Sequence, residues 1–275
     1  MSLLDFTARS EKKFNDMPKR TIRVNTLVLT LAILFVSASN PAYSAMKDVS
    51  VSVGAMSWYN RYVPISRIAG ADVPKSSYGF MYGPTIRAQH NNLYFAVTYL
   101  LSSDNYNLVV TDSPVSIHHA KANSSASRSD IDVVVGYLLP PTLNVHTGYK
   151  GIFVDDAISF ASSGRTASAK RNETYNVATL GTGITIPFGK KIILFVNGDV
   201  LLGSFHNDVT YPAGYRRLSE PVDDSIAWGV SADTRAVITI YNHLSANIGL
   251  KAQYIKAGSD NSSFLGPTVD IEYRF

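Results

Sequence analysis

The 275-residue chain has no cysteine, which excludes a disulfide scaffold and any metal or redox site built on thiolates. Nothing after residue 45 approaches the run of about 18 apolar residues that indicates a membrane-spanning helix. Charged residues are also scarce, at 17%, whereas the chain holds 16 tyrosines and 12 phenylalanines. Because no membrane-spanning helix is expected after residue 45, the many tyrosines and phenylalanines must belong to another kind of structure.

The first 45 residues have the order of a secretory signal peptide. A basic patch at 19–23 precedes the apolar run 26–36, and the small-residue site 42–45 (Ala-Tyr-Ser-Ala) follows it. A run of this length is well short of the ~20 residues that a helix needs to span a bilayer. We expect cleavage at that site, with Met17 as the true start, so that residues 1–45 form the leader.

The mature chain, residues 46–275, has almost no net charge. The leader holds six of the 25 basic residues and three of the 21 acidic ones, which leaves 19 and 18. The formal charge of +4 thus falls to +1, and no basic footprint for nucleic acid remains. We expect no nucleic-acid partner.

The last twelve residues, 264–275, carry the clearest single pattern. Four apolar side chains alternate with three charged ones, namely Val269, Ile271, Tyr273 and Phe275 with Asp270, Glu272 and Arg274. A period of two places the two sets on opposite faces of a strand. An apolar face that ends in aromatics, opposite ionised groups, is typical of a strand between lipid and a wet lumen.

Similar alternation recurs through the mature chain. The expected strands are 47–59, 79–90, 93–103, 129–139, 142–154, 173–188, 190–203, 224–238, 244–256 and 264–275. Short turns near 91, 140, 189 and 242 alternate with longer polar connections at 60–78, 104–127, 155–172, 204–223 and 257–262. This layout predicts an all-β fold, a transmembrane antiparallel up-and-down β-barrel in the outer membrane of a Gram-negative bacterium. We expect about ten strands, with eight as the alternative.

The mature chain resembles small Gram-negative outer-membrane barrels of the Ail/OmpX type and the opacity type. The residues that carry the resemblance are the terminal segment 270–275 and the pairs Gly136-Tyr137 and Gly148-Tyr149. The resemblance implies that Ile271, Tyr273 and Phe275 form a signal read by the barrel-assembly machinery. It also implies adhesion at the cell surface as a role. The expected strand count departs from the usual eight of these barrels.

The polar faces of the expected strands place eleven charged groups in the lumen. These are Arg87, Asp130, Asp132, Lys150, Asp199, Asp233, Arg235, Lys251, Asp270, Glu272 and Arg274. The two signs nearly cancel, and a barrel of about this size has an interior that side chains can fill. We expect one layer of salt bridges toward the periplasm and one toward the cell surface, which together block free diffusion. The alternative is a narrow charged channel.

A protease at the outer rim is a further alternative. It would need paired carboxylates and a histidine–aspartate base around one water. Asp130 with Asp132, and His206 with Asp208 or the pair 223–224, are the candidates. No other feature of the chain resembles the outer-membrane proteases.

Outer-membrane enzymes that remove acyl chains from lipid A use an outward His-x-Ser pair with an acid. His243-Leu244-Ser245 has this spacing, but it falls in a predicted periplasmic turn, far from the outer leaflet, so the pair is rejected. His118-His119 is a loop pair of low specificity, and no phosphate loop or metal-spaced histidine cluster is present. We expect no enzymatic activity, no cofactor and no metal.

The long connections are the expected site of function. Segments 113–129 and 160–172 are rich in serine and alanine with scattered basic residues, and segment 204–224 adds two tyrosines and two arginines. Such surfaces could contact lipopolysaccharide, a host ligand or another surface partner. The sequence thus predicts a role in envelope structure or surface interaction through extracellular loops, with outer-membrane lipid and the assembly machinery as further partners.

Overall fold

The structure is a computed structural model that describes residues 49–275 except for 66, 69–70, 73–76, 103–105, 111–120, 140, 163–164, 190, 211–222 and 259. Residues 1–48 lie outside this part, so the expected signal peptide and its cleavage stay predictions. Among the described residues, no helix is both long and apolar enough to cross a membrane.

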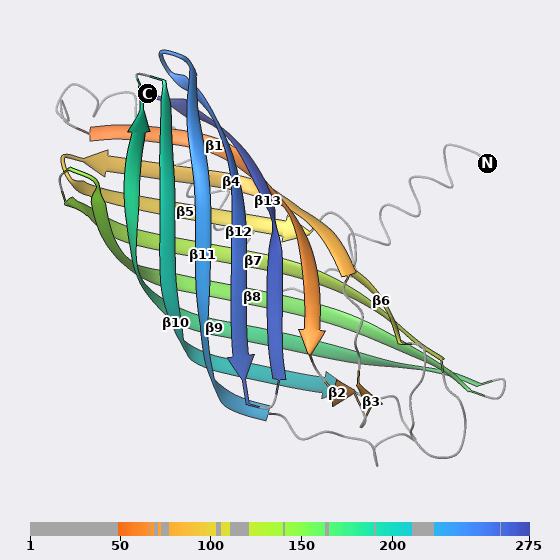
Figure 1. Cartoon of the computed structure of the whole chain (residues 1–275). Coiled ribbons are helices and arrows are strands. Elements are labelled where there is room, and N and C mark those ends of the chain that lie inside the picture. Colours follow the sequence, from red (N-terminus) through yellow and green to blue (C-terminus); the bar gives the residue numbers. More distant parts are fainter. Residues whose placement is uncertain are drawn as a thin grey trace, which may run out of the picture. The chain divides into compact units, whose positions relative to one another are not determined.

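Ten strands form a closed antiparallel barrel (Figure 1). They are β1 (Val49–Ile65), β4 (Ser77–His90), β5 (Leu93–Ser102), β7 (Lys121–Leu139), β8 (Leu143–Ser162), β9 (Arg165–Phe188), β10 (Ile192–Thr210), β11 (Asp223–Tyr241), β12 (Leu244–Ala257) and β13 (Asp260–Arg274). Each pairs with the next, and β13 closes the barrel by pairing with β1. The predicted fold class and the count of ten are confirmed.

Three shorter strands lie near the ends of the barrel strands opposite Phe275. β6 (Tyr106–Val110) pairs with the part of β7 that extends past β5. β2 (Arg67–Ile68) and β3 (Ala71–Asp72) pair with each other in a small separate sheet. These elements fall in segments that the sequence pattern assigned to long connections.

The tight turns lie where the sequence predicts them, at the end of the barrel that carries Phe275. Asn91 has a φ of 51° in the turn between β4 and β5, and Gly189 has a φ of 70° between β9 and β10. Asparagine and glycine adopt this left-handed conformation at lower cost than other residues. By the predicted topology, this end of the barrel is the periplasmic one.

At the opposite end the strands are longer than expected. β8 and β9 remain paired from Leu143↔Ile184 to Ser162↔Arg165, and β10 continues to Thr210. The prediction that 155–172 is a loop is therefore wrong. The prediction that 204–223 is a loop is wrong for residues 204–210, which belong to β10. In this part the inner side chains, such as Asp156 and Arg171, are buried but charged, and the outer ones, such as Lys170 and Asn172, are exposed and polar. The apolar–polar alternation that marks a strand is therefore absent although pairing continues.

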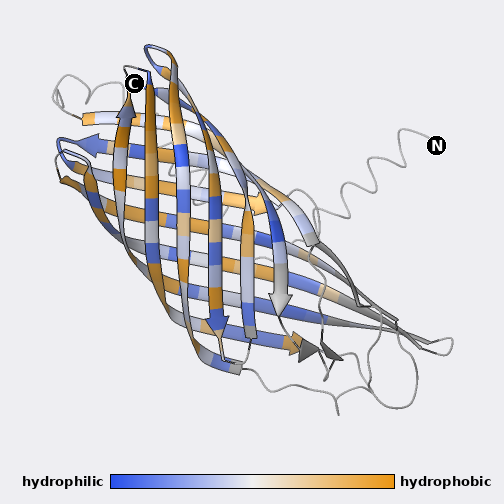
Figure 2. Ribbon diagram, viewed as in Figure 1, coloured by the Kyte–Doolittle hydropathy of each residue, from blue (hydrophilic) through white to orange (hydrophobic). Residues whose placement is uncertain are grey.

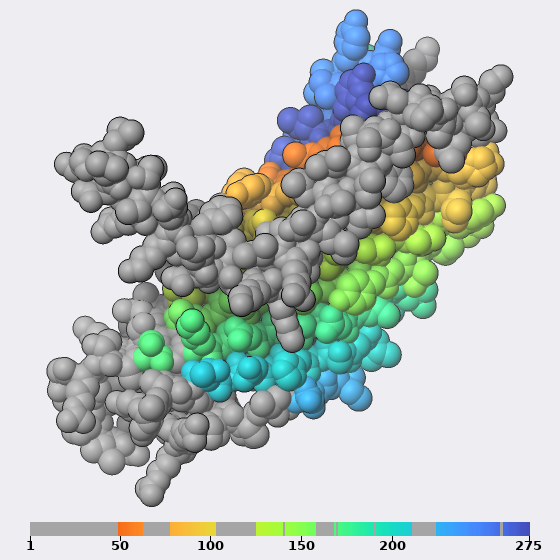
Figure 3. Space-filling view, turned by 180° about the vertical axis from the view of Figure 1, so that it is seen from behind, coloured from red at the N-terminus to blue at the C-terminus, as the bar shows by residue number. Residues whose placement is uncertain are grey.

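Hydrophobic and hydrophilic residues alternate along the ribbons of the barrel strands (Figure 2). Large exposed apolar side chains, one from each strand in order, are Tyr59, Phe80, Leu93, Val135, Val145, Leu180, Val200, Val230, Leu250 and Val269. Seen from behind, the strands coloured yellow to cyan lie side by side as one wall (Figure 3). A closed wall with this much exposed apolar surface matches a barrel surrounded by lipid.

Candidate functional site

An apolar cluster crosses the interior of the barrel, and every strand contributes to it. One member from each strand, in order, is Trp58, Met81, Leu100, Ala126, Ile152, Val177, Leu201, Ala227, Ile255 and Phe264. We call these ten side chains the septum. Each is at most 4% exposed. A water-filled pore would leave the side chains of its wall accessible, so the interior is closed to water at this level.

The sequence analysis missed the septum because it assigned apolar side chains to the lipid face. A signal for it is present where alternation breaks down. In Val200-Leu201-Leu202, Val200 and Leu202 are exposed on the outside, whereas Leu201 is 2% exposed. Three consecutive apolar residues mark a stretch in which both faces of the strand are apolar, and here the inner face belongs to the septum.

Arg128 of β7 lies against the septum. Its guanidinium donates to Asp130 at 2.6 and 2.5 Å, and the same group lies 3.6 Å from the ring centre of Phe264 and 5.3 Å from that of Trp58. Such bidentate pairing and stacking require the planar arginine fork. Asp130 was a predicted lumen residue, and its arginine partner was not.

Replacing Arg128 by lysine should therefore destabilise the barrel although the charge is kept. A lysine can neither bind both carboxylate oxygens in this geometry nor stack between the two rings. We expect a loss of about 1–3 kcal/mol in the free energy of unfolding, measured by urea titration in detergent micelles. Lys170→Arg, on the exposed side of β9, is the matched exchange and should change nothing measurable. Equal effects of the two variants would contradict this role for Arg128.

Asp132, Lys150 and Lys251 form the next group. The Asp132 carboxylate binds Lys150 Nζ on the adjacent strand β8 and, at 3.1 Å, Lys251 Nζ on β12, across the barrel interior. Lys251 Nζ also lies 5.1 Å from the ring centre of Trp58. One carboxylate thus holds two ammonium groups directly beside the septum.

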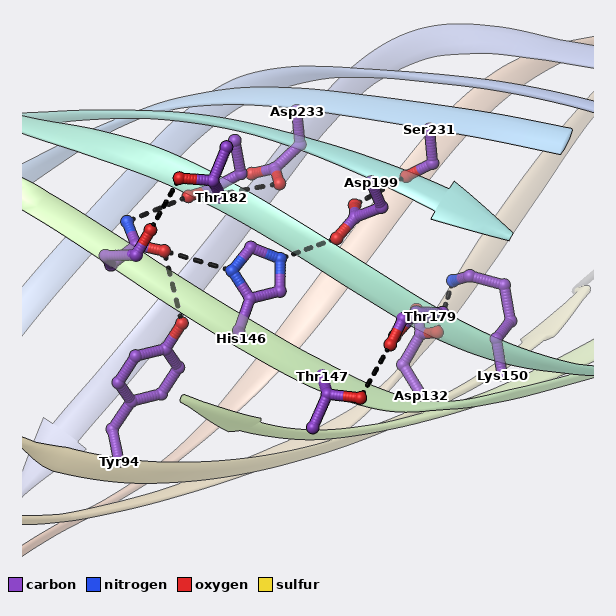
Figure 4. A network of polar contacts seen from close by, with 12 residues as sticks. Tyr94, Asp132, His146, Thr147, Lys150, Thr179, Thr182, Asp199, Ser231 and Asp233 are labelled. Carbon is purple, nitrogen blue, oxygen red and sulfur yellow. Dashed lines mark hydrogen bonds and ion pairs between the residues drawn. The ribbon is translucent and has the colours of Figure 1, made fainter. Parts of the chain in front are cut away.

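His146 is the centre of a buried polar network (Figure 4). Hydrogen bonds link six side chains in the order Asp233, Asn197, Asn144, His146, Asp199 and Ser231. His146 Nε2 lies 2.5 Å from Asp199 Oδ1, and His146 Nδ1 lies 3.0 Å from Asn144 Oδ1. Gly181 and Gly183 of β9 leave room for this network, because a Cβ at either position would overlap with it. Asp199 and Asp233 thus have neutral or histidine partners instead of the expected lysines and arginines.

Arg87 organises the periplasmic end of the interior. It contacts Asp270 at 3.3 Å and also pairs with Glu272, and Asn247 donates to both carboxylates at 3.0 and 3.1 Å. Arg235 stacks on Phe195, with its guanidinium carbon 5.3 Å from the ring centre. Arg274 is exposed at the end of β13.

A further ion-pair group lies at the base of the paired segments 155–162 of β8 and 165–172 of β9, which we call the outer extension of the barrel. Arg171 binds Asp156 at 3.3 Å and Glu173 at 3.2 Å, and Tyr175 Oη donates to Glu173 at 3.4 Å. The sequence analysis missed Arg171 and Asp156 because both fall within the segment assigned to a loop.

Of the candidate protease residues, the structure brings His206 and Asp224 together, but it does not bring them to the carboxylate pair of Asp130 and Asp132. Asp130 and Asp132 lie inside the barrel, bound to basic side chains. His206 lies on the outward face, 50% exposed, with Nδ1 2.6 Å from Asp224 Oδ1. The barrel wall therefore separates the histidine from both carboxylates. His118-His119 falls outside the described residues.

The rejected pair at 243–245 lies in the turn and first residues of β12. His243 Nδ1 is 3.0 Å from the carbonyl oxygen of Arg274, close to the carboxyl end of the chain. The three residues predicted to form the assembly signal, Ile271, Tyr273 and Phe275, all face outward with 56%, 48% and 47% of their surface exposed.

No protein-family model matches the chain, and no curated protein matches it either. Among solved structures, the outer-membrane protease OmpT from Escherichia coli is similar, with a TM-score of 0.56 and 10% identity over 83% of this chain and 97% of OmpT. The translocator domain of the autotransporter NalP from Neisseria meningitidis gives a TM-score of 0.49 at 11% identity, covering 94% of this chain and all of that domain. Neisserial surface protein A gives a TM-score of 0.29 at 14% identity, covering 82% of this chain and 97% of that protein.

At 10% identity the likeness to OmpT concerns the fold alone. The other two TM-scores are below 0.5 and support no conclusion. The narrower resemblance to the Ail/OmpX and opacity types therefore stays a prediction. The closed ten-strand wall, its apolar outer face and its tight turns at one end are the features of an outer-membrane barrel, and the fold is similar to that of OmpT. The chain thus has the fold of a closed ten-stranded antiparallel outer-membrane β-barrel.

Proposed function

We propose that this protein is a closed outer-membrane barrel that acts at the cell surface, through the part of the barrel that extends beyond the membrane, and not as a channel. The septum is the observation that supports this proposal. All ten strands contribute a side chain that is at most 4% exposed, and ion pairs lie on both sides of this layer. A solute would have to displace packed apolar side chains and separate paired charges in order to pass.

The outer extension supports a role at the surface. Membrane-spanning strands need about 9–11 residues, whereas β8 has 20 residues and β9 has 24. The excess lies at the end opposite the tight turns, where these strands run beyond the apolar band. Extracellular interaction with lipopolysaccharide or with a host or surface ligand is the role that we assign to this region.

Removing part of the outer extension tests whether it is separate from the closed barrel. Joining residues 156 and 171 by a four-residue turn should leave the lumen closed, because the septum members Ile152 and Val177 remain in place. We expect the heat-dependent gel mobility of a folded barrel to persist, together with a loss of binding to immobilised lipopolysaccharide. A shortened barrel that binds as well as the full chain would argue against this surface role.

The aromatic carboxyl end provides a separate prediction about assembly. Deleting Phe275 should lower the amount of folded protein in the outer membrane, because the assembly machinery is expected to read this residue. Refolding of the purified variant in detergent should be unchanged. Phe188→Ala removes an outward phenylalanine, 57% exposed, at the end of β9 and is the control. Normal assembly without Phe275 would remove it from the proposed signal.

A further inference from the structure

A second polar cluster lies on the outward side of the barrel wall. His206 of β10 and Asp224 of β11 are directly opposite in the strand register, and His206 Nδ1 is 2.6 Å from Asp224 Oδ1. The two side chains are 50% and 78% exposed. Ser204 precedes His206 by two residues and is also exposed, so both lie on the outward face of β10.

Asn176 of β9 belongs to the same cluster. It lies directly opposite Ser204, and Cβ atoms in such pairs are roughly 4.5–5.5 Å apart. The Asn176 amide oxygen accepts a hydrogen bond of 2.6 Å from Tyr149 Oη on β8. This bond fixes the orientation of the amide, so that its Nδ2 group acts as a donor on the side away from Tyr149.

The pairing with Asp224 also determines what His206 can do. An ionised carboxylate only accepts hydrogen bonds, so Nδ1 carries the proton and Nε2 keeps a lone pair. A histidine oriented in this way by a carboxylate is a general base for a neighbouring hydroxyl. Ser204 and His206 are separated by two strand rises, roughly 6.6 Å. Proton transfer between them therefore requires the Ser204 hydroxyl and the His206 ring to turn toward each other while His206 Nδ1 stays bound to Asp224.

The cluster lies where the apolar band of the barrel ends. Leu202, two residues before Ser204 on the same face, is 63% exposed, and Ile226, opposite Ser204 on β11, is 71% exposed. From Ser204 outward this face of β10 carries Ser204, His206 and Asp208. In an outer-membrane barrel, the change from apolar to polar side chains on the lipid face marks the boundary between hydrocarbon and headgroups. The ester bonds of membrane lipids lie at this depth.

We propose that Ser204, His206 and Asn176 form an esterase site for the acyl esters of outer-leaflet lipids, with Asp224 as a positioning residue. Ser204 Oγ attacks the ester carbonyl carbon while its proton passes to His206 Nε2. Asn176 Nδ2 donates to the resulting oxyanion. The ester C–O bond then breaks, and the leaving alkoxide takes the proton from His206. Water, deprotonated by His206 Nε2, then attacks the acyl-serine. The bond between the acyl carbon and Ser204 Oγ breaks, the fatty acid leaves, and His206 returns the proton to Ser204 Oγ.

This site goes beyond the surface role proposed above, and it would overturn the expectation that the chain has no enzymatic activity. It differs from the protease alternative because it needs neither Asp130 nor Asp132, which lie on the other side of the wall. It also differs from the pair at 243–245, which lies at the opposite end of the barrel.

The test uses full-length protein extracted from outer membranes, mixed separately with micelles of lipopolysaccharide and of phosphatidylethanolamine. Fatty-acid release is followed by mass spectrometry, and the reactive serine by labelling with a fluorophosphonate. We expect labelling of Ser204 and release from at least one of the two lipids, which identifies the source of the ester. Ser204→Ala should abolish both. Asn176→Ala should lower the rate by roughly 10²–10³-fold.

Asp224→Asn should lower the turnover rate by up to about 10⁴-fold with little change in KM, a split that a merely structural role would not produce. The control variants are His243→Asn and Ser245→Ala, which should retain full activity. All variants should keep the heat-dependent gel mobility of a folded barrel. The proposal fails if the folded wild-type protein releases no fatty acid from either lipid and takes no label, or if release persists in Ser204→Ala. Neither result depends on whether the lumen conducts.

Discussion

Replacing Asp132 by alanine should destabilise the barrel more than any other single removal of a charge from its interior. The variant leaves Lys150 and Lys251 facing each other without the carboxylate that holds both ammonium groups. Their side chains are only 5% and 12% exposed, so water cannot replace the lost partner. Removing one partner of a buried ion pair lowers the free energy of unfolding by about 3–5 kcal/mol. The free energy of unfolding, measured by urea titration in detergent micelles, should fall by this amount.

Two further variants separate the loss of a partner from the loss of packing. Lys251→Met leaves the pair of Asp132 and Lys150 intact and should cost less than Asp132→Ala. The triple variant Asp132→Leu, Lys150→Met, Lys251→Met replaces the whole group by apolar side chains and should recover most of the stability, because buried ion pairs are often replaceable in this way. A triple variant that is less stable than Asp132→Ala would contradict the explanation.

Removing two large septum side chains should open the barrel. In Trp58→Ala with Leu201→Ala, two side chains that are at most 2% exposed become methyl groups, one on β1 and one on β10. Because each change leaves a cavity, Trp58→Ala should cost about 3–5 kcal/mol and Leu201→Ala about 2–5 kcal/mol. We expect liposomes that contain the refolded double variant to swell in isotonic solutions of small sugars, whereas liposomes with the wild-type protein do not.

The control for this experiment is available on the lipid side of the same wall. Trp228→Ala with Leu202→Ala removes the same two residue types from positions that are 48% and 63% exposed. This variant should remain impermeable. If both double variants leak equally, general loosening of the wall explains the leak, and the septum does not.

The fold could be predicted from the sequence because alternation needs no knowledge of distant contacts. In the terminal segment, Ile271 and Tyr273 face outward and Asp270 and Glu272 are buried, as a period of two requires. The tight turns were recognisable for the same reason, since Asn91 and Gly189 supply the backbone conformation locally. The outer extension could not be recognised, because both faces of its strands carry polar side chains, buried ones such as Arg171 inside and exposed ones such as Lys170 outside.

The partners inside the lumen could not be read from the sequence in the same way. Alternation shows that Asp132 and Lys251 share the inner side of the wall, but their meeting depends on the stagger of strands that are far apart in the sequence. His146 was placed on a polar face, yet nothing local indicated that Asp199 would be its partner. The pair of His206 and Asp224 is an intermediate case, because both residues were candidates and only the register between β10 and β11 joins them.

Single-channel recording of the refolded mature protein in planar bilayers tests the closed lumen most directly. With the septum intact, a barrel that shows heat-dependent gel mobility should give no current steps at moderate voltage. Steady, charge-selective steps from that same folded protein would contradict the closed lumen and make Asp132, Lys150 and Lys251 the filter of a narrow channel.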